Sequence, residues 1–106
     1  MNKICFLIPY YNHPAKISKL CKILKQYNLP IILVDDGSSD NFNFETLDIE
    51  VLKHDKNKGK GAALKTGFNY AIKNDYTHAF QIDADMQHDL SKIDEFLEIY
   101  KNNKDI

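Results

Sequence analysis

A cluster of acidic and amide side chains follows an apolar run late in the chain, in the segment Gln81–Asp89. Asp83 and Asp85 stand two residues apart, so in an extended chain their side chains leave the same face, and Gln87 comes next on that face. Neighbouring carboxylates repel one another unless a cation or a shared proton relieves the repulsion. Hard oxygen ligands of this kind suit Mg²⁺ or Mn²⁺, in particular an ion that also holds a phosphate. The alternative is a solvated turn with one aspartate capping a helix, but Asp89 or Ser91 already supplies a cap, so we expect a metal site.

A second acidic motif, Asp35–Asp40, follows the apolar run Ile31–Val34, and Gly37 permits a tight turn within it. A carboxylate at this place can accept a hydrogen bond from a nucleobase N–H group or a pair of bonds from ribose hydroxyls. The alternative is a turn in which an aspartate side chain closes the strand by bonding to its own backbone. Alone, the motif is weak evidence for a nucleoside site, and the acidic cluster described above makes that interpretation stronger.

The lysine- and glycine-rich loop Lys56–Gly61 leads into a predicted helix. Lys58 and Lys60 stand near the helix N-terminus, where the helix dipole disfavours cations. A bound anion would offset that penalty and would use the free N–H groups of the first turn. The loop lacks the spacing of a P-loop, and a solvated lysine-rich turn remains the alternative.

Histidine and tyrosine side chains accompany these motifs. His88 lies in the acidic cluster and has either a structural role or a role in the site, whereas we expect the other histidines to be surface or strand-edge residues: His13, His54 and His78. Tyr10 and Tyr11 follow the first apolar run. One of them can stack on a nucleobase, and the other is expected to pack in the core.

The elements that must position these residues can be read from the hydrophobic periodicity. Four strands are expected, at Ile4–Ile8 (closed by Pro9), Ile31–Val34, Ile49–Leu52 and Ala79–Ile82. Three helices are expected, from Pro14 to a stop at Asn28 and Pro30, from Ala62 to Lys73, and from Ser91 to Lys101. The first helix carries an apolar stripe of Ile17, Leu20, Cys21 and Leu24, and the second one of Leu64, Phe68, Ala71 and Ile72. Residues 41–48 look irregular.

The order of the elements predicts an α/β fold, with a mostly parallel sheet and helices on both faces. Each polar motif follows a strand: Tyr10–Asn12, Asp35–Asp40 and Asp83–Asp89. Ligands of open α/β sheets bind beyond the carboxyl ends of the strands, so we expect the three motifs to meet in one site.

Length and composition bound the remaining possibilities. A length of 106 residues allows one domain. The chain has 14 lysines and no arginine, and its formal net charge of −1 argues against a general nucleic-acid binder, which would carry a basic excess. No apolar run is long enough to span a bilayer or to serve as a secretory signal, which predicts a cytoplasmic protein. Cys5 and Cys21 are expected to be buried free thiols.

Four motifs in this order resemble the N-terminal part of family 2 glycosyltransferases, which have the Rossmann-like GT-A fold. The resemblance covers residues 4–99 and rests on Ile8–Asn12, Val34–Asp40, Asn57–Phe68 and Asp83–His88. The Asp-x-Asp-x-Gln-His segment resembles that of the branch similar to dolichyl-phosphate mannose synthase, and the lysine- and glycine-rich loop looks like the Gly-Leu-Gly or Gly-Lys-Gly segment of that branch.

The resemblance implies roles for individual residues. Pro9, Tyr11 and Asp36 would line a nucleoside pocket, with Asp36 bonded to the base, and Lys60 and Asp83 would lie along the nucleotide. Asp83, Asp85 and Gln87 would hold the Mg²⁺ or Mn²⁺ that bridges the diphosphate. A diphosphate-contacting arginine of other members is not assignable here, because Leu64 occupies the equivalent position.

The implied activity is metal-dependent transfer of a sugar from a nucleoside-diphosphate sugar, linked to UDP or GDP, to an acceptor. The branch implies a lipid-linked acceptor and a peripheral location at the inner face of the membrane. Family catalytic domains continue past the helix where this chain stops, so residues 1–106 are expected to form the nucleotide-sugar-binding part of a domain truncated at its C-terminus, without the general base.

Two other classes of protein fit parts of the pattern. A noncatalytic nucleotide-binding module, or a remnant that needs a partner, would share the pocket and lack turnover. A magnesium-dependent phosphoryl-transfer or receiver-type domain also places carboxylates at strand ends, but it needs a lysine after a later strand, and no such pair is present in the sequence.

Overall fold

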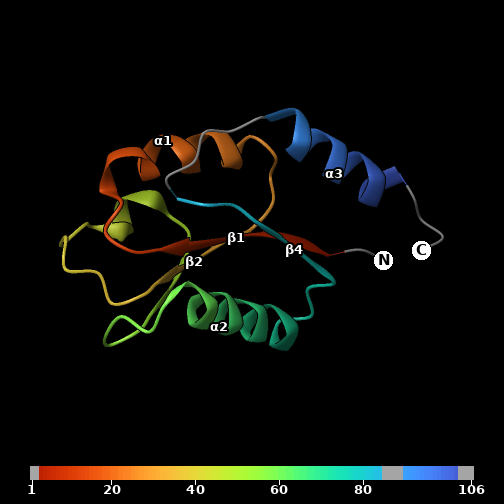
Figure 1. Cartoon of the computed structure of the whole chain (residues 1–106). Helices are drawn as coiled ribbons and strands as arrows, with labels where there is room; N and C mark the ends of the chain where they lie inside the picture. Colours follow the sequence, from red (N-terminus) through yellow and green to blue (C-terminus); the bar gives the residue numbers. More distant parts are fainter. Residues whose placement is uncertain (1–2, 85–89, 103–106) are drawn as a thin grey trace.

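The computed structural model describes residues 3–84 and 90–102, which form a four-stranded parallel sheet between two layers of helices (Figure 1). The strands are β1 (Ile4–Tyr10), β2 (Ile31–Asp35), β3 (Glu50–Lys53) and β4 (His78–Gln81), and the helices are α1 (Pro14–Lys25), α2 (Lys60–Lys73) and α3 (Leu90–Asn102), with a short 3₁₀ turn, η1, at Phe44–Leu47. The strand order is β3-β2-β1-β4, and every pairing is parallel. The predicted α/β class and the helices on both faces are therefore confirmed.

The alternation of side chains along the two central strands divides the core into two layers. Phe6, Ile8 and Leu33 point to the face covered by α1 and α3, whereas Leu7 and Val34 point to the face covered by α2. All five side chains are fully buried. A strand buried on both faces reads as a continuous apolar run, which is why β1 and β2 are the clearest strands in the sequence.

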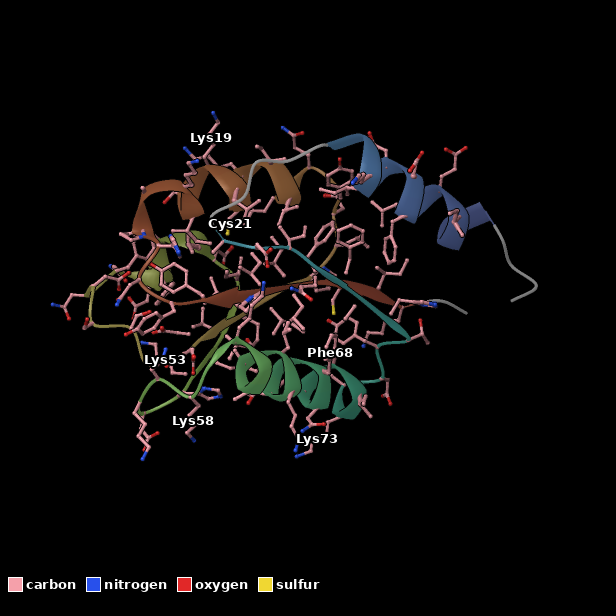
Figure 2. All side chains as sticks on the ribbon, in the orientation of Figure 1. Lys19, Cys21, Lys53, Lys58, Phe68 and Lys73 are labelled. Carbon is pink, nitrogen blue, oxygen red and sulfur yellow. The ribbon has the colours of Figure 1, made fainter. Side chains whose placement is uncertain are left out.

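Helix α1 has the predicted amphipathic pattern. The four residues of its predicted stripe are buried, namely Ile17, Leu20, Cys21 and Leu24. Figure 2 shows Cys21 pointing toward the sheet and Lys19 pointing away from it. Cys5 and Cys21 are both buried free thiols, as predicted. Among the described residues, no helix has the length and apolar character needed to cross a membrane.

Strand β1 continues through Pro9 to Tyr10, so the prediction that Pro9 closes the strand is wrong. In a parallel strand, successive residues bond to opposite neighbours. Ile82 donates its N–H group to the Leu7 carbonyl on the β4 side, and Asp36 donates to the Tyr10 carbonyl on the β2 side. Pro9 therefore faces the β4 side, and β4 pairs with β1 only as far as Leu7. The N–H group that proline lacks has no partner to lose there.

Helix α2 begins at Lys60, two residues before its predicted start, and buries its predicted stripe only in part. Its buried residues are Ala63, Gly67 and Ala71, whereas Phe68 and Ile72 are exposed. A Cβ atom added at Gly67 would lie 2.3 Å from Cδ1 of Leu7. The helix therefore approaches the sheet too closely for a large side chain at this position. Of the predicted stripe, Ala71 is buried and Leu64 packs against the core, and the prediction is wrong for the two exposed residues.

The segment 41–48 is more regular than predicted, because η1 forms within it. The Asn43 side chain accepts a hydrogen bond from the Glu45 N–H group and caps the turn. Phe44 and Leu47 are buried and join the core layer under α1. Strand β3 follows, one residue later than predicted at each end.

Gly37 lies where the loop after β2 passes against the loop that leads into α2. Its φ angle is +73°, and a Cβ atom there would lie 2.3 Å from the backbone carbon of Lys56. We predict that Gly37→Ala lowers the free energy of unfolding by roughly 2–3 kcal/mol, because the substitution adds both backbone strain and a backbone clash. Urea unfolding monitored by circular dichroism measures the loss.

Gly61→Ala is the matched control for Gly37→Ala. Gly61 lies in the first turn of α2, and a Cβ atom there meets nothing within 4 Å. Alanine at this helical position is expected to raise stability by about 0.5–1 kcal/mol. Equal effects of the two substitutions would contradict the close approach of the two loops.

Candidate functional site

A pocket of about 290 Å³ opens at the carboxyl edge of the sheet. Its walls come from the ends of β1, β2 and β4 and from the start of α2. The lining residues are Pro9, Tyr10, Tyr11, His13, Asp36, Asn57, Lys60, Ala63, Asp83 and Ala84. The five residues predicted to bind a nucleotide (Pro9, Tyr11, Asp36, Lys60 and Asp83) thus line one pocket.

Strand alternation explains how Asp36 and Asp83 come to one wall. Ile32 and Val34 of β2 face α2, and Asp36 continues that series directly after the strand. Ala79 of β4 also faces α2, and Asp83 lies four residues further on. Both carboxylates therefore lie on the α2 side of the sheet, near the N-terminus of that helix.

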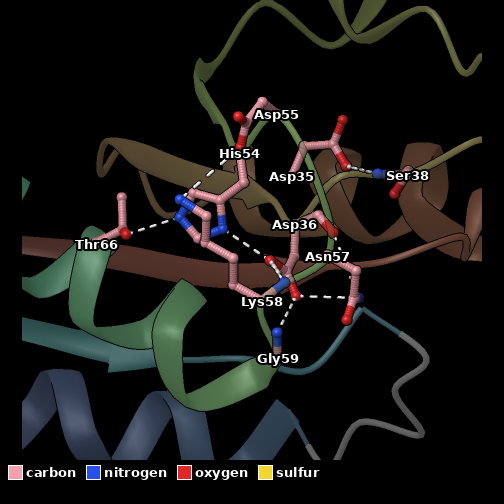
Figure 3. A network of polar contacts seen from close by, with 9 residues as sticks. All are labelled: Asp35, Asp36, Ser38, His54, Asp55, Asn57, Lys58, Gly59 and Thr66. Carbon is pink, nitrogen blue, oxygen red and sulfur yellow. Dashed lines mark hydrogen bonds and ion pairs between the residues drawn. The ribbon is translucent and has the colours of Figure 1, made fainter.

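Asp36 is 2% exposed and accepts four hydrogen bonds through its carboxylate (Figure 3). Its Oδ1 atom lies 2.7 Å from Nδ1 of His54 and 2.9 Å from the backbone nitrogen of Lys58. Its Oδ2 atom lies 2.8 Å from the backbone nitrogen of Gly59 and 3.2 Å from Nδ2 of Asn57. One buried carboxylate thus holds the loop Asn57–Gly59 against the end of β2.

The pKa of Asp36 reflects a competition between burial and hydrogen bonding. Burial alone would raise the pKa of the carboxyl, because it removes solvent from the charged form. The hydrogen bond to His54 and those from the Lys58 and Gly59 N–H groups outweigh burial and lower the pKa below its usual value. Asp36 is therefore a carboxylate at neutral pH.

The neighbouring Asp35 closes a turn by bonding to the backbone, which was the alternative role considered for this motif. Its Oδ1 atom accepts a hydrogen bond of 3.1 Å from the Ser38 N–H group, which closes the turn after β2. Ser38 in turn accepts from the Asn12 N–H group, and the Asn12 side chain accepts from the Ser39 N–H group. These contacts tie the loop after β1 to the loop after β2, so the first two polar motifs meet as predicted.

The sequence predicted a surface or strand-edge residue at His54, which does follow the edge strand β3 but is not on the surface. Its side chain is 9% exposed, and both ring nitrogens have partners, Asp36 at Nδ1 and Thr66 of α2 at Nε2. Its position directly after β3 is the signal that could have revealed it, since the other site residues also follow strands. His13, by contrast, is exposed, as predicted, and lies on the pocket wall.

Lys60 and Asp83 form an ion pair across the pocket wall. The Lys60 Nζ atom lies 2.8 Å from Asp83 Oδ1, and the two side chains are 57% and 50% exposed. Gln81 also donates to Asp83 Oδ1, at 3.2 Å. The Lys60 ammonium, more than any other neighbour, lowers the pKa of the Asp83 carboxyl. A pair this exposed contributes only about 0–1 kcal/mol to stability and is easily exchanged for other partners.

Tyr10 ends β1 and packs in the core, as predicted for one of the two tyrosines, and Tyr11 directly follows the strand. Tyr10 is 1% exposed, packs edge to face on Phe44 and donates its hydroxyl proton to Asp40. Burial, reinforced by that carboxylate, raises the pKa of the Tyr10 phenol. Tyr11 is 45% exposed and lines the pocket. Tyr11 is therefore the ring that is available to stack on a ligand.

The predicted metal ligands are described only in part. Asp83 offers a half-exposed carboxylate to the pocket, which fits a hard divalent cation. Asp85 and Gln87, as well as His88, lie outside the described residues. Within residues 3–84 and 90–102, no three histidine, cysteine, aspartate or glutamate side chains gather closely enough to hold a metal ion.

We predict that Asp36→Asn lowers the free energy of unfolding by about 2–4 kcal/mol at pH 7, because an amide cannot accept all four donors. Since the pKa of Asp36 is lower in the folded chain than in the unfolded one, the carboxylate contributes its stability above the unfolded value near pH 4. That contribution is lost as the pH falls through the folded pKa. The difference in free energy of unfolding between the native chain and Asp36→Asn should therefore become smaller below about pH 4. Urea titrations at several pH values measure this difference.

Asp55→Asn is the matched control for Asp36→Asn. Asp55 stands near the same loop, its side chain is 83% exposed, and its contact with Lys58 Nζ is 3.8 Å long. A change within about 0.5 kcal/mol is expected for this variant. A similar loss in both variants would contradict the central place of Asp36.

Comparisons with known proteins identify several glycosyltransferases that are similar to the chain. The chain is 34% identical to the undecaprenyl-phosphate 4-deoxy-4-formamido-L-arabinose transferase of Proteus mirabilis, over 82% of the chain and 30% of that relative. It is 32% identical to the UDP-N-acetylglucosamine–dolichyl-phosphate N-acetylglucosaminyltransferase of Methanococcus voltae, over 85% of the chain and 45% of the relative. It is 29% identical to the dolichol-phosphate mannosyltransferase of Pyrococcus furiosus, over 98% of the chain and 32% of the relative.

The chain thus spans less than half the length of each of these three relatives. Residues 5–106 match glycosyl transferase family 2. A match over nearly the whole chain, together with the parallel α/β fold, identifies the family, and the chain belongs to glycosyl transferase family 2.

Proposed function

We propose that the chain is the donor-binding part of an enzyme that transfers a sugar from a nucleoside-diphosphate sugar to an acceptor. The observation that carries this proposal is the gathering of Pro9, Tyr11, Asp36, Lys60 and Asp83 around one pocket. The pocket's volume, about 290 Å³, is close to the lower end of the range for small-molecule sites. It is open at the carboxyl edge of the sheet, so a sugar attached to the diphosphate can project from it.

The nucleoside is proposed to lie at the Tyr11 and Asp36 end of the pocket. The exposed Tyr11 ring offers a stacking face, and Pro9 supplies an apolar wall beside it. Asp36 can accept a hydrogen bond from a base N–H group if the base replaces the Asn57 amide, the longest of the bonds to its carboxylate. The other three donors would keep the carboxylate in place.

The diphosphate is proposed to lie at the start of α2. Lys60 is the first residue of this helix, and the first turn contains no acidic side chain. The helix dipole and the free N–H groups of this turn favour an anion. Lys60 would leave Asp83 and bind a phosphate oxygen, an exchange that the exposure of the pair makes inexpensive.

Asp83, Asp85 and Gln87 are proposed to hold Mg²⁺ or Mn²⁺ beside the diphosphate. When bound, such an ion stabilises the negative charge that develops on the departing nucleoside diphosphate. The acceptor oxygen attacks the anomeric carbon, and the bond from that carbon to the diphosphate oxygen breaks. An acceptor that is already a phosphate needs no base to remove a proton, whereas a hydroxyl acceptor does.

A lipid-linked phosphate is the proposed acceptor. The three relatives are named for undecaprenyl phosphate, dolichyl phosphate and dolichol phosphate, respectively. Such an acceptor would bring the protein to the surface of a membrane, and we propose a peripheral position at its cytoplasmic face. The proposed donor is a sugar linked to either UDP or GDP.

Calorimetric titration of UDP and of GDP, with Mn²⁺ and with a chelator, tests the donor site. We expect one of the two nucleotides to bind with Mn²⁺ and to lose roughly tenfold or more in affinity when the ion is chelated. Asp83→Asn and Asp85→Asn should each remove that metal dependence, and the control Asp48→Asn, whose side chain is 99% exposed, should not. The absence of any metal-dependent binding would refute the proposal.

A Lys60→Met variant tests the diphosphate position. Its affinity for the nucleotide that binds should fall by roughly tenfold or more, since a charge-assisted bond to phosphate is lost. Lys58→Met is the control, because Lys58 is a similarly exposed lysine in the loop just before the helix and does not line the pocket. An equal loss in the two variants would point to general electrostatic attraction instead of a contact at Lys60.

A further inference from the structure

His54 occupies a position that the proposed function does not use. Its backbone N–H group donates to the Asp35 carbonyl at 2.8 Å, which fixes the residue to the end of β2. Its imidazole is almost fully enclosed and lies between the carboxylate of Asp36 and the hydroxyl of Thr66 (Figure 3). A buried histidine with both nitrogens engaged has one orientation and cannot turn without losing a bond.

The partners of His54 determine where its proton lies. Asp36 is a carboxylate and can only accept, so Nδ1 carries the proton and donates to Oδ1. In the neutral imidazole, Nε2 is then an acceptor, and Thr66 donates its hydroxyl proton to it. The three side chains form a directed series of hydrogen bonds from α2 to the end of β2.

This series closes a ring around the start of α2. Asp36 binds the N–H groups of Lys58 and Gly59, and the next residue, Lys60, begins the helix and lines the pocket. Thr66 lies six residues into the same helix and returns to Asp36 through His54. The loop before the helix and the helix itself are thereby attached to one carboxylate.

We propose that His54 is a positioning residue of the donor pocket, which orients Asp36 and so fixes the places of Asn57 and Lys60 on the pocket wall. The inference rests on the proposed function, since it gives His54 its role through the donor site. His54 itself touches no ligand. Its effect on nucleotide binding depends on the bond to Asp36, and the bond to Thr66 adds stability only.

Three substitutions separate the two bonds of the imidazole. The amide nitrogen of asparagine is as far from Cβ as Nδ1 is, so His54→Asn keeps a donor for Asp36 and loses Thr66. The longer glutamine reaches the place of Nε2, so His54→Gln keeps the contact with Thr66 and loses Asp36. Thr66→Val has nearly the same shape as the native residue and removes only the hydroxyl.

The experiment measures two properties of the 106-residue chain and of each variant. Calorimetry with Mn²⁺ gives the affinity for UDP and GDP, and amide hydrogen exchange followed by NMR gives the protection of the Lys58 and Gly59 N–H groups. His54→Gln should bind about tenfold or more weaker, with faster exchange at both amides. His54→Asn and Thr66→Val should stay within about threefold of the native chain in both measurements, although their urea midpoints fall.

The two readouts distinguish failure of this inference from failure of the proposed function. If the native chain binds neither nucleotide with any metal, the proposed donor site is refuted, and amide exchange still decides the role of His54. Protection at Lys58 and Gly59 that is the same in His54→Gln and His54→Asn would overturn the positioning role. An affinity that simply follows the loss of stability across the three variants would overturn it as well.

Discussion

The rest of the site depends on the need to surround the buried carboxylate of Asp36 with hydrogen-bond donors. An ionised group at 2% exposure is strongly unfavourable unless hydrogen-bond donors surround it. The chain supplies those donors from His54 at the end of β3 and from the loop Asn57–Gly59. The requirement to solvate one charge therefore determines the course of the loop and the point at which α2 begins.

Close packing on the α2 face makes that arrangement precise. Gly37 lets the loop after β2 pass against the backbone of Lys56 and Asn57, and Gly67 lets α2 approach Leu7. Larger side chains at either glycine would move the helix or the loop relative to the carboxylate. Electrostatics thus selects the partners of Asp36, and the two glycines allow them to come near enough to bond.

The fold and the pocket were largely readable from the sequence, because buried strands give apolar runs and parallel strands end at one edge. The sequence did not predict that Asp35 closes the turn and Asp36 binds the loop before α2, since these roles depend on the face to which each side chain points at the end of β2. His54 was missed because its two partners, Asp36 and Thr66, are 18 and 12 residues away in the sequence. Phe68 and Ile72 were wrongly assigned to the buried face of α2, because the small residues at the centre of that face give little hydrophobic signal.

The two carboxylates of the pocket differ in a way that suits a site which must both hold and release a charged ligand. Asp36 is enclosed and bonded to several fixed backbone groups, so it gives the nucleoside end a defined shape. Asp83 is half exposed and paired with an exposed lysine side chain, so its partner can change when an anion or a cation arrives. Binding at the diphosphate end then requires little reorganisation of the protein, because the exchange breaks one exposed ion pair and leaves the network around Asp36 intact. A carboxylate as buried as Asp36 could not serve at both ends, since exchanging its partners would leave several donors unsatisfied.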